Sequence, residues 1–170
     1  IFAYDTQRTR LAPIHERLKR NGVRNAQVRN PDDGALDDLV GKMDRVVIDA
    51  PCTGTGTWRR RPDTKWKLTP AQLEARLADQ VQVLDEAVRF LKPGGQLVYI
   101  TCSILPEEND DQIKAFLERH EGFRLVSLPE RWDALFPGAP KPLSTDGNTI
   151  TLTPAATDTD GFFCAVLTRG

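Results

Sequence analysis

The sequence has few of the features that would place it outside the ordinary globular class. No apolar run approaches the length of a membrane span, and the first residues carry no basic segment leading into an apolar stretch, which argues against a signal peptide. Only three cysteines are present, too few for a disulfide framework, and no CxxC or Cys/His spacing indicates zinc. These absences predict a cytoplasmic protein without a metal.

An excess of positive charge is also missing. The 23 Lys and Arg residues are balanced by 24 Asp and Glu residues, whereas non-specific nucleic-acid binding depends on neutralising phosphates. Residues 58–67 (WRRRPDTKWK) differ from this average, because they hold five cations and two tryptophans. Such a segment is either a solvated basic loop or a nucleic-acid contact. Its position shortly after Cys52 favours the contact.

Apolar periodicity predicts strands that alternate with helices. The longest helical pattern covers 73–91, and Thr69-Pro70 marks its start. A helix with Leu11, Ile14 and Leu18 on one face precedes it, and another opens at Pro106. Residues 129–160 predict a long irregular loop with a short strand near 150–152. The expected fold is α/β, with a parallel or mostly parallel sheet covered by helices on both faces; its strands are 1–5, 26–29, 45–49, 96–101, 123–128 and 162–168.

Two of the cysteines directly follow apolar strands. Cys52 comes after 46–48 (VVI), and Cys102 after 97–100 (LVYI). Ligands of open α/β sheets bind at the carboxyl ends of the strands, so these two nucleophiles are expected to meet in one crevice. A lone buried cysteine is more often a small hydrophobe, and Cys164, inside the last strand, fits that description. A thiol enzyme with a histidine base is disfavoured, because neither histidine lies at a strand end.

Five motifs in order carry a resemblance to a known family. They are 49–54 (DAPCTG), 60–66 (RRPDTKW), 91–95 (LKPGG), 101–109 (TCSILPEEN) and 160–163 (DGFF). Together they resemble the RNA 5-methylcytosine methyltransferases of the Sun/Fmu family, and its bacterial ribosomal RNA members are the most similar. The resemblance extends over nearly the whole chain. It implies a Rossmann-like, S-adenosylmethionine-dependent methyltransferase sheet that acts on RNA, with ribosomal RNA as the expected substrate.

The resemblance gives the two cysteines different roles. It implies that Cys102 adds as a thiolate to carbon 6 of cytosine, that carbon 5 then takes the methyl group of S-adenosylmethionine, and that Cys52 assists release. A free thiol is only roughly 3% thiolate at pH 7, so a lowered pKa is expected at the attacking cysteine. Asp49 would hydrogen-bond the cytosine edge and stabilise its protonated form, or contact the cofactor; a capping role in the following turn is the alternative.

The same resemblance suggests residues for the cofactor. Asp5 closes the first strand, where a carboxylate accepts hydrogen bonds from ribose hydroxyls. Asp32 follows the second strand, where the family places a side chain near the adenine, and the adjacent Asp33 is an equal candidate. Both are otherwise turn-forming residues. Asp49 and Pro51 complete the expected cofactor-binding set.

The basic segment supplies the expected RNA contacts. Arg60, Arg61 and Lys65 are candidates to hold phosphates, and Trp66 or Trp58 to stack on a base or to pack beneath the loop. A cytosine that reaches buried thiols must be unstacked or single-stranded, which favours a loop or bulge in the RNA.

The chain departs from the family pattern at its start. Such an enzyme begins its site with a strand and a Gly-rich loop, for which 54–56 (GTG) is a weak substitute. We therefore expect 1–170 to form one partial catalytic domain, with a gap between the strands that end at Asp5 and Asp49. The isolated chain is expected to bind S-adenosylmethionine poorly and to be inactive. The alternatives are an N-methyltransferase on the same fold and a non-catalytic RNA-binding or assembly module.

Overall fold

The computed structural model describes residues 1–32 and 34–170, which form two compact units, 1–40 and 41–170. Each unit has its own sheet, and within the described residues no strand of one sheet pairs with a strand of the other. The strand that ends near Asp5 and the strand that ends at Asp49 therefore belong to different sheets.

The first unit is a short parallel pair of strands with helices between them. Strands β1 (Phe2–Tyr4) and β2 (Gln27–Arg29) pair in parallel, and a 3₁₀ turn, η1 (Asp37–Leu39), follows. The single helix expected here is instead two, α1 (Arg8–Leu11) and α2 (Ile14–Arg20). Pro13 lies between them, and because proline lacks an N–H and clashes with the preceding turn, the first helix ends before it. Gly22, at φ 65°, follows the second helix as expected.

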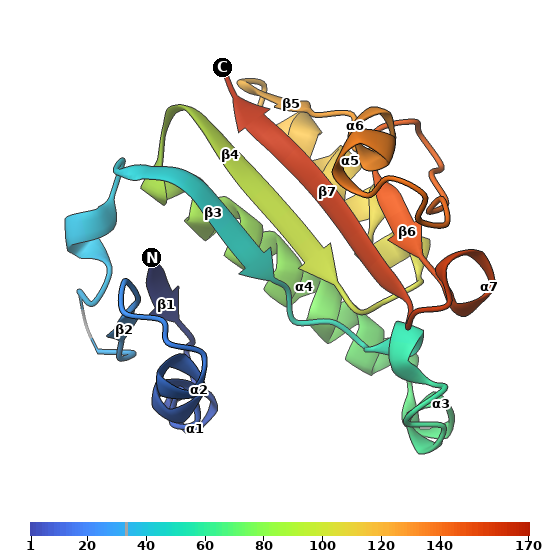
Figure 1. Ribbon diagram of the computed structural model, residues 1–170, viewed down its shortest axis with the longest axis horizontal. Coiled ribbons are helices and arrows are strands. Elements are labelled where there is room, and N and C mark those ends of the chain that lie inside the picture. Colours follow the sequence, from blue (N-terminus) through green and yellow to red (C-terminus); the bar gives the residue numbers. More distant parts are fainter. Residues whose placement is uncertain (33) are drawn as a thin grey trace. The chain divides into compact units, whose positions relative to one another are not determined.

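The second unit is built on a mixed five-stranded sheet in which neighbours run β3-β4-β7-β5, with β6 also paired to β7 (Figure 1). Strand β3 (Met43–Asp49) is parallel to β4 (Leu91–Thr101). Strand β7 (Phe162–Arg169) is antiparallel to β4, to β5 (Phe123–Leu125) and to β6 (Ile150–Leu152). The expectation of a parallel or mostly parallel sheet is therefore wrong for this unit, because β7 runs against each of its neighbours. The carboxyl ends of β3 and β4 thus lie side by side, which is what positions the site described below.

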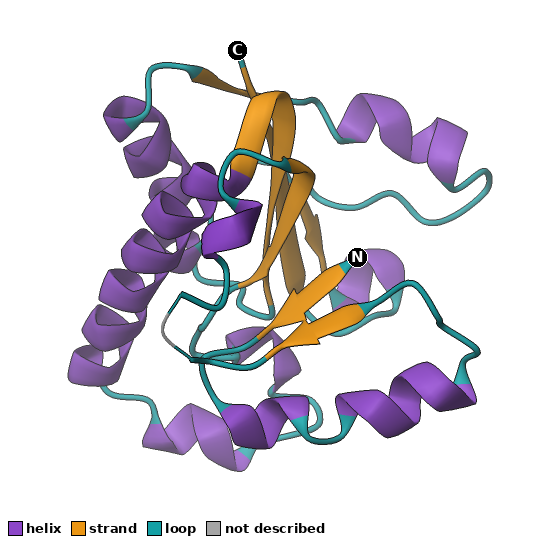
Figure 2. Cartoon of the chain, turned by 90° about the vertical axis from the view of Figure 1, so that its left-hand side faces the viewer, coloured by secondary structure: helices purple, strands orange, loops and turns teal. Residues whose placement is uncertain are grey.

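Two helices cover one face of this sheet, α4 (Pro70–Ala87), continued by the 3₁₀ turn η3 (Val88–Phe90), and α5 (Asp110–Arg119). Both lie behind the sheet in Figure 1, whereas α6 (Pro129–Leu135) stands on the other side, so helices flank the sheet as expected (Figure 2). Alternate strand residues point toward α4 and α5 and form the core; it includes Ile48, Leu84, Leu97, Tyr99, Phe116, Phe163 and Leu167. No helix in the described ranges is both long and apolar enough to cross a membrane.

The start of α4 is fixed by a capping box at the place that the sequence predicts. The Thr69 hydroxyl accepts a hydrogen bond from the Gln72 backbone N–H at 3.3 Å, and the Gln72 side chain accepts one from the Thr69 N–H at 3.1 Å. Pro70 occupies the first turn, where its missing N–H leaves no helical bond unmade.

Residues 129–160 hold more regular structure than the irregular loop that we expected. The short strand predicted near 150–152 is confirmed as β6, but two helices accompany it, α6 (Pro129–Leu135) and α7 (Pro154–Thr157). Each begins with proline in its first turn, so a residue that indicates a loop by composition here starts a helix.

Candidate functional site

The Cys52 and Cys102 Sγ atoms lie 3.4 Å apart. Strands β3 and β4 are adjacent and parallel, with Asp49 opposite Ile100, and the Ala50 N–H continues the pairing by donating to the Ile100 carbonyl at 2.9 Å. Each cysteine therefore begins the turn that follows its strand, on the same edge of the sheet. The structure brings the two thiols together as their positions in the sequence predict.

A pocket of about 430 Å³ opens over the two thiols, within the size range of small-ligand sites. Its lining comes from the ends of β3 and β4, the segment after Cys52 and the start of β7. Asp49, Arg60, Arg61 and Phe162 are among the residues that line it, together with both cysteines. The pocket thus gathers an acid, two cations and two thiols around one space.

The hydrogen bond between the thiols separates their pKa values. The bond from Cys52 lowers the pKa of Cys102 to about 7, against the opposing effects of burial and of the Asp49 and Glu108 carboxylates. The same bond raises the pKa of Cys52, and burial raises it further. At neutral pH Cys102 is therefore about half thiolate, whereas Cys52 remains a thiol.

Two glycines shape the turn after Cys52. Gly54 has φ 72°, a left-handed conformation that turns the chain toward the 3₁₀ turn η2 (Thr55–Thr57). The Gly56 N–H donates to the Cys102 carbonyl at 3.0 Å, and its own carbonyl accepts from the Gly161 N–H at 2.8 Å. A Cβ atom on Gly56 would lie 2.2 Å from the Gly161 carbonyl oxygen. Glycine here allows close backbone contact between the Cys52 turn and the start of β7.

A buried carboxylate that the sequence interpretation passed over holds the same turn. Glu108 ends the 3₁₀ turn η4 (Pro106–Glu108), is fully buried, and accepts hydrogen bonds from the Thr53 N–H at 2.8 Å, the Thr53 hydroxyl and the Gln80 amide at 3.1 Å. The sequence suggested only a carboxylate near a helix N-terminus. Its place inside the TCSILPEEN motif was the one signal that it belonged with the cysteines.

The turn after Cys102 is held by Asn109, the residue that follows Glu108 in the chain. The Asn109 side chain accepts from the Thr101 hydroxyl at 2.7 Å and donates to the Ser103 carbonyl at 3.0 Å. Thr55 connects the two turns, because its hydroxyl lies 2.9 Å from that of Ser103 and accepts from the Ile104 N–H at 3.0 Å. The turns that carry the two thiols are therefore both held in place by side-chain hydrogen bonds.

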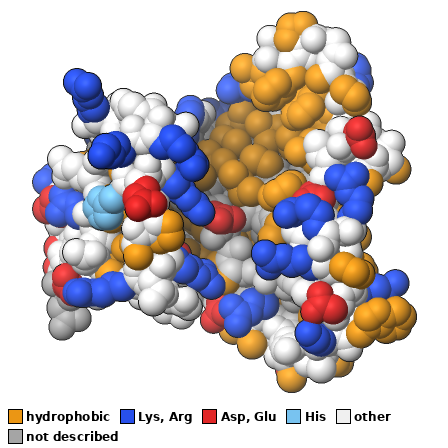
Figure 3. Space-filling view, turned by 60° about the horizontal axis from the view of Figure 1, so that its bottom comes forward, with side chains coloured by type: hydrophobic (Ala, Val, Ile, Leu, Met, Phe, Trp, Pro, Cys, Tyr) orange, Lys and Arg blue, Asp and Glu red, His pale blue; other side chains and the backbone are white. Residues whose placement is uncertain are grey.

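The basic segment lies along the rim of the pocket. Lys and Arg side chains gather over η2 and α3 (Asp63–Lys67) in Figure 3. Arg61 lines the pocket, and Arg60 lines it while pairing with the Asp160 carboxylate. The Lys65 ammonium lies 5.5 Å from the ring centroids of both Trp58 and Trp66. Trp66 is 83% exposed and does not line the pocket.

The chain matches a methyltransferase family over nearly its whole length. Residues 1–168 fit the family model described as 16S rRNA methyltransferase RsmB/F. The chain belongs to this family. Its similarity to curated relatives is spread over the same range: it is 37% identical to ribosomal RNA small subunit methyltransferase B of Enterobacter sp. (strain 638) and 38% identical to that of Erwinia tasmaniensis. Each alignment covers 99% of this chain but 36% of the relative, so the chain spans about a third of their length.

Solved structures confirm the methyltransferase fold of this RsmB/F family chain. It is similar to a methyltransferase homolog from Pyrococcus horikoshii, with a TM-score of 0.77 and 29% identity over 100% of this chain and 53% of that one. It is also similar to NSun6 from the same organism, solved with the S-adenosylmethionine analogue SFG, with a TM-score of 0.80 and 30% identity over 99% of this chain and 41% of that one.

The cofactor-binding candidates of this RsmB/F chain are divided between the two units. In the first unit, Asp5 follows β1 and accepts from the Gln7 N–H at 2.7 Å, and Asp32 follows β2 and pairs with Arg8. Because β1 and β2 are parallel, these carboxylates follow the same edge of their sheet. Asp33 lies outside the described residues. Asp49 and Pro51 are in the second unit, where the Pro51 carbonyl accepts from the Gln80 amide at 2.9 Å.

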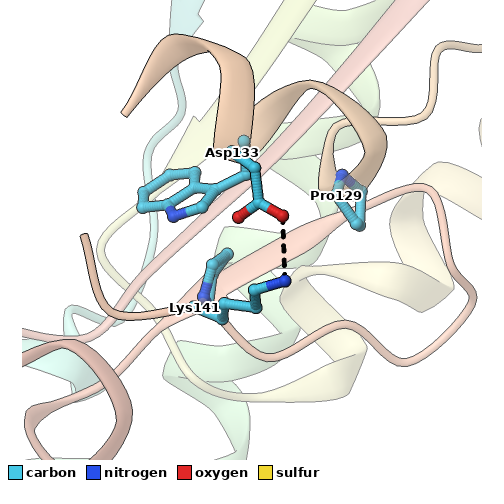
Figure 4. A pocket seen from close by; sticks show the side chains of 5 residues that line it. Pro129, Asp133 and Lys141 are labelled. Atoms are coloured by element: carbon cyan, nitrogen blue, oxygen red, sulfur yellow. Dashed lines mark hydrogen bonds and ion pairs between the residues drawn. The ribbon is translucent and has the colours of Figure 1, made fainter. Parts of the chain in front are cut away.

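A second, smaller depression in the RsmB/F chain contains none of the predicted residues. It lies between α6 and the segment after it, lined by Pro129, Trp132, Asp133, Lys141 and Pro142. In Figure 4 the Asp133 carboxylate points toward the Lys141 ammonium, and the two are 2.9 Å apart. The ion pair occupies the polar groups of the depression, so the thiol pocket remains the candidate active site.

Proposed function

We propose that the longer protein containing this chain methylates carbon 5 of a cytosine in ribosomal RNA, and that residues 1–170 act there as one partial catalytic domain. The observation that carries the proposal is the 3.4 Å thiol pair inside an open pocket that also holds Asp49. Methylation of an exocyclic nitrogen requires no thiol nucleophile. Two thiols with opposite pKa shifts are what an addition followed by a release requires.

Cys102 is the proposed nucleophile. Its pKa, lowered to about 7, keeps about half of it as thiolate at neutral pH. The sulfur forms a bond to carbon 6 of the cytosine, and the electrons of the carbon 5–carbon 6 double bond make carbon 5 nucleophilic. S-adenosylmethionine, when bound, supplies an electrophilic methyl group. Asp49 shares the pocket and is placed in the proposal as the acceptor for the protonated cytosine edge.

Cys52 is the proposed release group. After methylation, carbon 5 still carries its proton, and removal of that proton restores the ring double bond as the carbon–sulfur bond to Cys102 breaks. Cys52 is a thiol at neutral pH, so in the proposal its S–H donates a proton to the departing Cys102 sulfur, and the Cys52 thiolate formed in that step, a strong base because its pKa is raised, takes the proton from carbon 5. The proximity of the two sulfur atoms supports this division of roles.

The residues suggested for the cofactor fit such a group chemically. The Asp5 and Asp32 side chains are 29% and 60% exposed, so each carboxylate is open to accept hydrogen bonds from ribose hydroxyls or an adenine amino group. Asp5 and Asp32 follow strands of one sheet, whereas Asp49 and Pro51 belong to the other. In the described residues the two sheets share no strand pairing. We therefore propose that the 170-residue chain alone binds S-adenosylmethionine weakly and is inactive. Micromolar affinity in titration calorimetry would contradict the weak binding.

The test of the function uses the full-length protein, transcribed 16S ribosomal RNA and labelled S-adenosylmethionine. We expect labelled 5-methylcytosine from the wild type. Cys102→Ala should abolish turnover without a covalent RNA adduct, whereas Cys52→Ala should trap an adduct that survives denaturing electrophoresis. Cys164→Ala, in β7, is the matched control and should leave turnover unchanged. Label on another base or on the exocyclic nitrogen of cytosine would refute the proposal, and the reverse pattern of adducts would exchange the roles of the two cysteines.

A further inference from the structure

Two consecutive residues, Glu108 and Asn109, each hold the turn that carries one of the thiols. The Glu108 carboxylate binds the N–H and hydroxyl of Thr53, the residue after Cys52. The Asn109 amide bridges Thr101 and Ser103, the residues on either side of Cys102. We propose that Glu108 and Asn109 are positioning residues that together set the separation of the Cys52 and Cys102 sulfur atoms. The function proposed above gives this separation its catalytic meaning.

The short segment that carries Glu108 and Asn109 is itself firmly anchored. The Glu108 carbonyl accepts from the buried Tyr99 hydroxyl at 2.8 Å, and the Asn109 carbonyl accepts from the Ile113 N–H at 3.1 Å at the start of α5. Both side chains are buried, Glu108 fully and Asn109 with 3% exposed. Because Glu108 and Asn109 are adjacent and both anchored, they fix the turn after Cys52 relative to the turn after Cys102. Two contacts from separate segments would hold each turn without fixing the distance between them.

A carboxylate is suited to the Cys52 side of this arrangement. It accepts two bonds from the one residue Thr53 and a third from Gln80, whose amide also donates to the Pro51 carbonyl. The chain is therefore held on both sides of Cys52. Removing the carboxylate would leave the Thr53 N–H and the Gln80 amide without this acceptor, and buried donors without a partner force the loop to move.

The pKa of Cys102 reports the separation and distinguishes position from charge. The groups that act on Cys102 are the Cys52 thiol, which lowers its pKa, and the Asp49 and Glu108 carboxylates, which raise it. Loss of the Glu108 charge alone would therefore move the pKa of Cys102 down. Loss of the position of Cys52 would break the thiol hydrogen bond and move the pKa up. The two explanations predict opposite signs.

The experiment measures the rate of Cys102 alkylation by iodoacetamide from pH 5.5 to 9.5, with each cysteine followed by peptide mass spectrometry. The wild type should show a midpoint near pH 7. Glu108→Ala and Asn109→Ala should move the midpoint toward about 8.5, which lowers the rate at pH 7 about fifteenfold. Glu108→Gln keeps an acceptor for the Thr53 N–H and should leave the midpoint unchanged or slightly lower. Glu107→Ala, the exposed neighbour, is the matched control and should match the wild type.

A folded Glu108→Ala variant with an unchanged midpoint would overturn the proposal, and so would a Glu108→Gln midpoint that rises as far as that of Glu108→Ala. Circular dichroism establishes which variants are folded. If the alanine variants do not fold, Thr53→Val decides, because it removes only the hydroxyl bond to Glu108. A raised midpoint supports positioning, and an unchanged one overturns it. Since neither RNA nor cofactor is present, failure of the methylation test leaves this result intact.

Discussion

The Cys52 and Cys102 sulfur atoms are 3.4 Å apart, although fifty residues separate them in the chain. Both are free thiols. At this distance each sulfur is the main influence on the ionisation of the other, and the chemistry of either cysteine depends on the presence of its partner.

Replacing Cys52 by alanine should therefore raise the pKa of Cys102. The hydrogen bond from Cys52 is the largest influence that lowers this pKa to about 7, and without it the value should move toward an ordinary 8.5 or above. Because the thiolate is the reactive form, the alkylation rate at pH 7 should fall about fifteenfold or more. Iodoacetamide rates across a pH series measure it. Cys164, whose pKa burial raises to about 11, serves as the internal reference and should react slowly throughout. An unchanged Cys102 midpoint would assign the lowered pKa to another group.

Hydrogen peroxide should convert the pair into a disulfide. The Cys102 thiolate attacks the peroxide to give a sulfenic acid and hydroxide; the Cys52 thiol then displaces hydroxide from the oxidised sulfur, so that two thiols lose two electrons and two protons and the peroxide becomes two waters. Tryptic mass spectrometry should find a Cys52–Cys102 peptide pair that dithiothreitol releases. Cys102→Ala is the control. A preference for disulfides to Cys164 would contradict the observed pairing.

The double substitution of Arg60 and Arg61 by alanine should weaken RNA binding by the full-length protein. Both line the thiol pocket, and losing two phosphate contacts should flatten the slope of log K against log salt by up to about 1.4. A filter-binding series from low to moderate salt measures the slope. Lys114→Ala with Arg124→Ala removes the same charge from exposed positions on α5 and β5 and is the matched control. Equal slopes for the two double variants would exclude the basic segment as the specific RNA contact.

Gly161→Ala should destabilise the second unit by about 1–3 kcal/mol. A Cβ atom there would lie 2.6 Å from both the Gly56 Cα and the Ile104 Cγ2, so the backbone of the Cys52 turn or of β7 has to shift. Urea unfolding measures the change. Gly122→Ala meets nothing within 4 Å and should remain within about 0.5 kcal/mol of the wild type. Equal stabilities for the two variants would show that the backbone contact relaxes easily.

The sequence predicted the strands and the long helix that carry the site better than the residues that hold its turns in place. Period-two and helical patterns located β3, β7, the carboxyl half of β4 and the start of α4, because each is a long element whose apolar face is buried. The start of β4 was wrong, since the strand begins at Leu91, where the helical pattern was expected to continue. The split at Pro13 and the helices at 129–135 and 154–157 were missed, since in short segments one proline or one capping residue outweighs composition.

The juxtaposition of the cysteines followed from strand polarity alone, but the residues that hold them did not. Glu108 looks like a surface carboxylate by type, and only the tertiary structure shows that its partners, Thr53 and Gln80, come from distant segments. The close contact of Gly56 with Gly161 likewise appears only in the folded structure, because a glycine in a sequence does not show which distant segment its backbone will contact. Hydrogen bonds of this kind join residues that are far apart in the sequence, and no local sequence pattern identifies such partners.

The wall of the thiol pocket contributed by β7 has a consequence for the chain during its synthesis. Arg60 and its partner Asp160 are one hundred residues apart, and the backbone contact of Gly56 waits for Gly161. At about 5–20 residues per second, a ribosome needs about 5–20 s to make that interval. Cys102 is itself made within that interval. For the roughly 3–12 s between Cys102 and Gly161 the nascent chain carries both cysteines without the segment that contacts the turn after Cys52, so the reactive pair acquires its pocket only when the last strand of the sheet emerges.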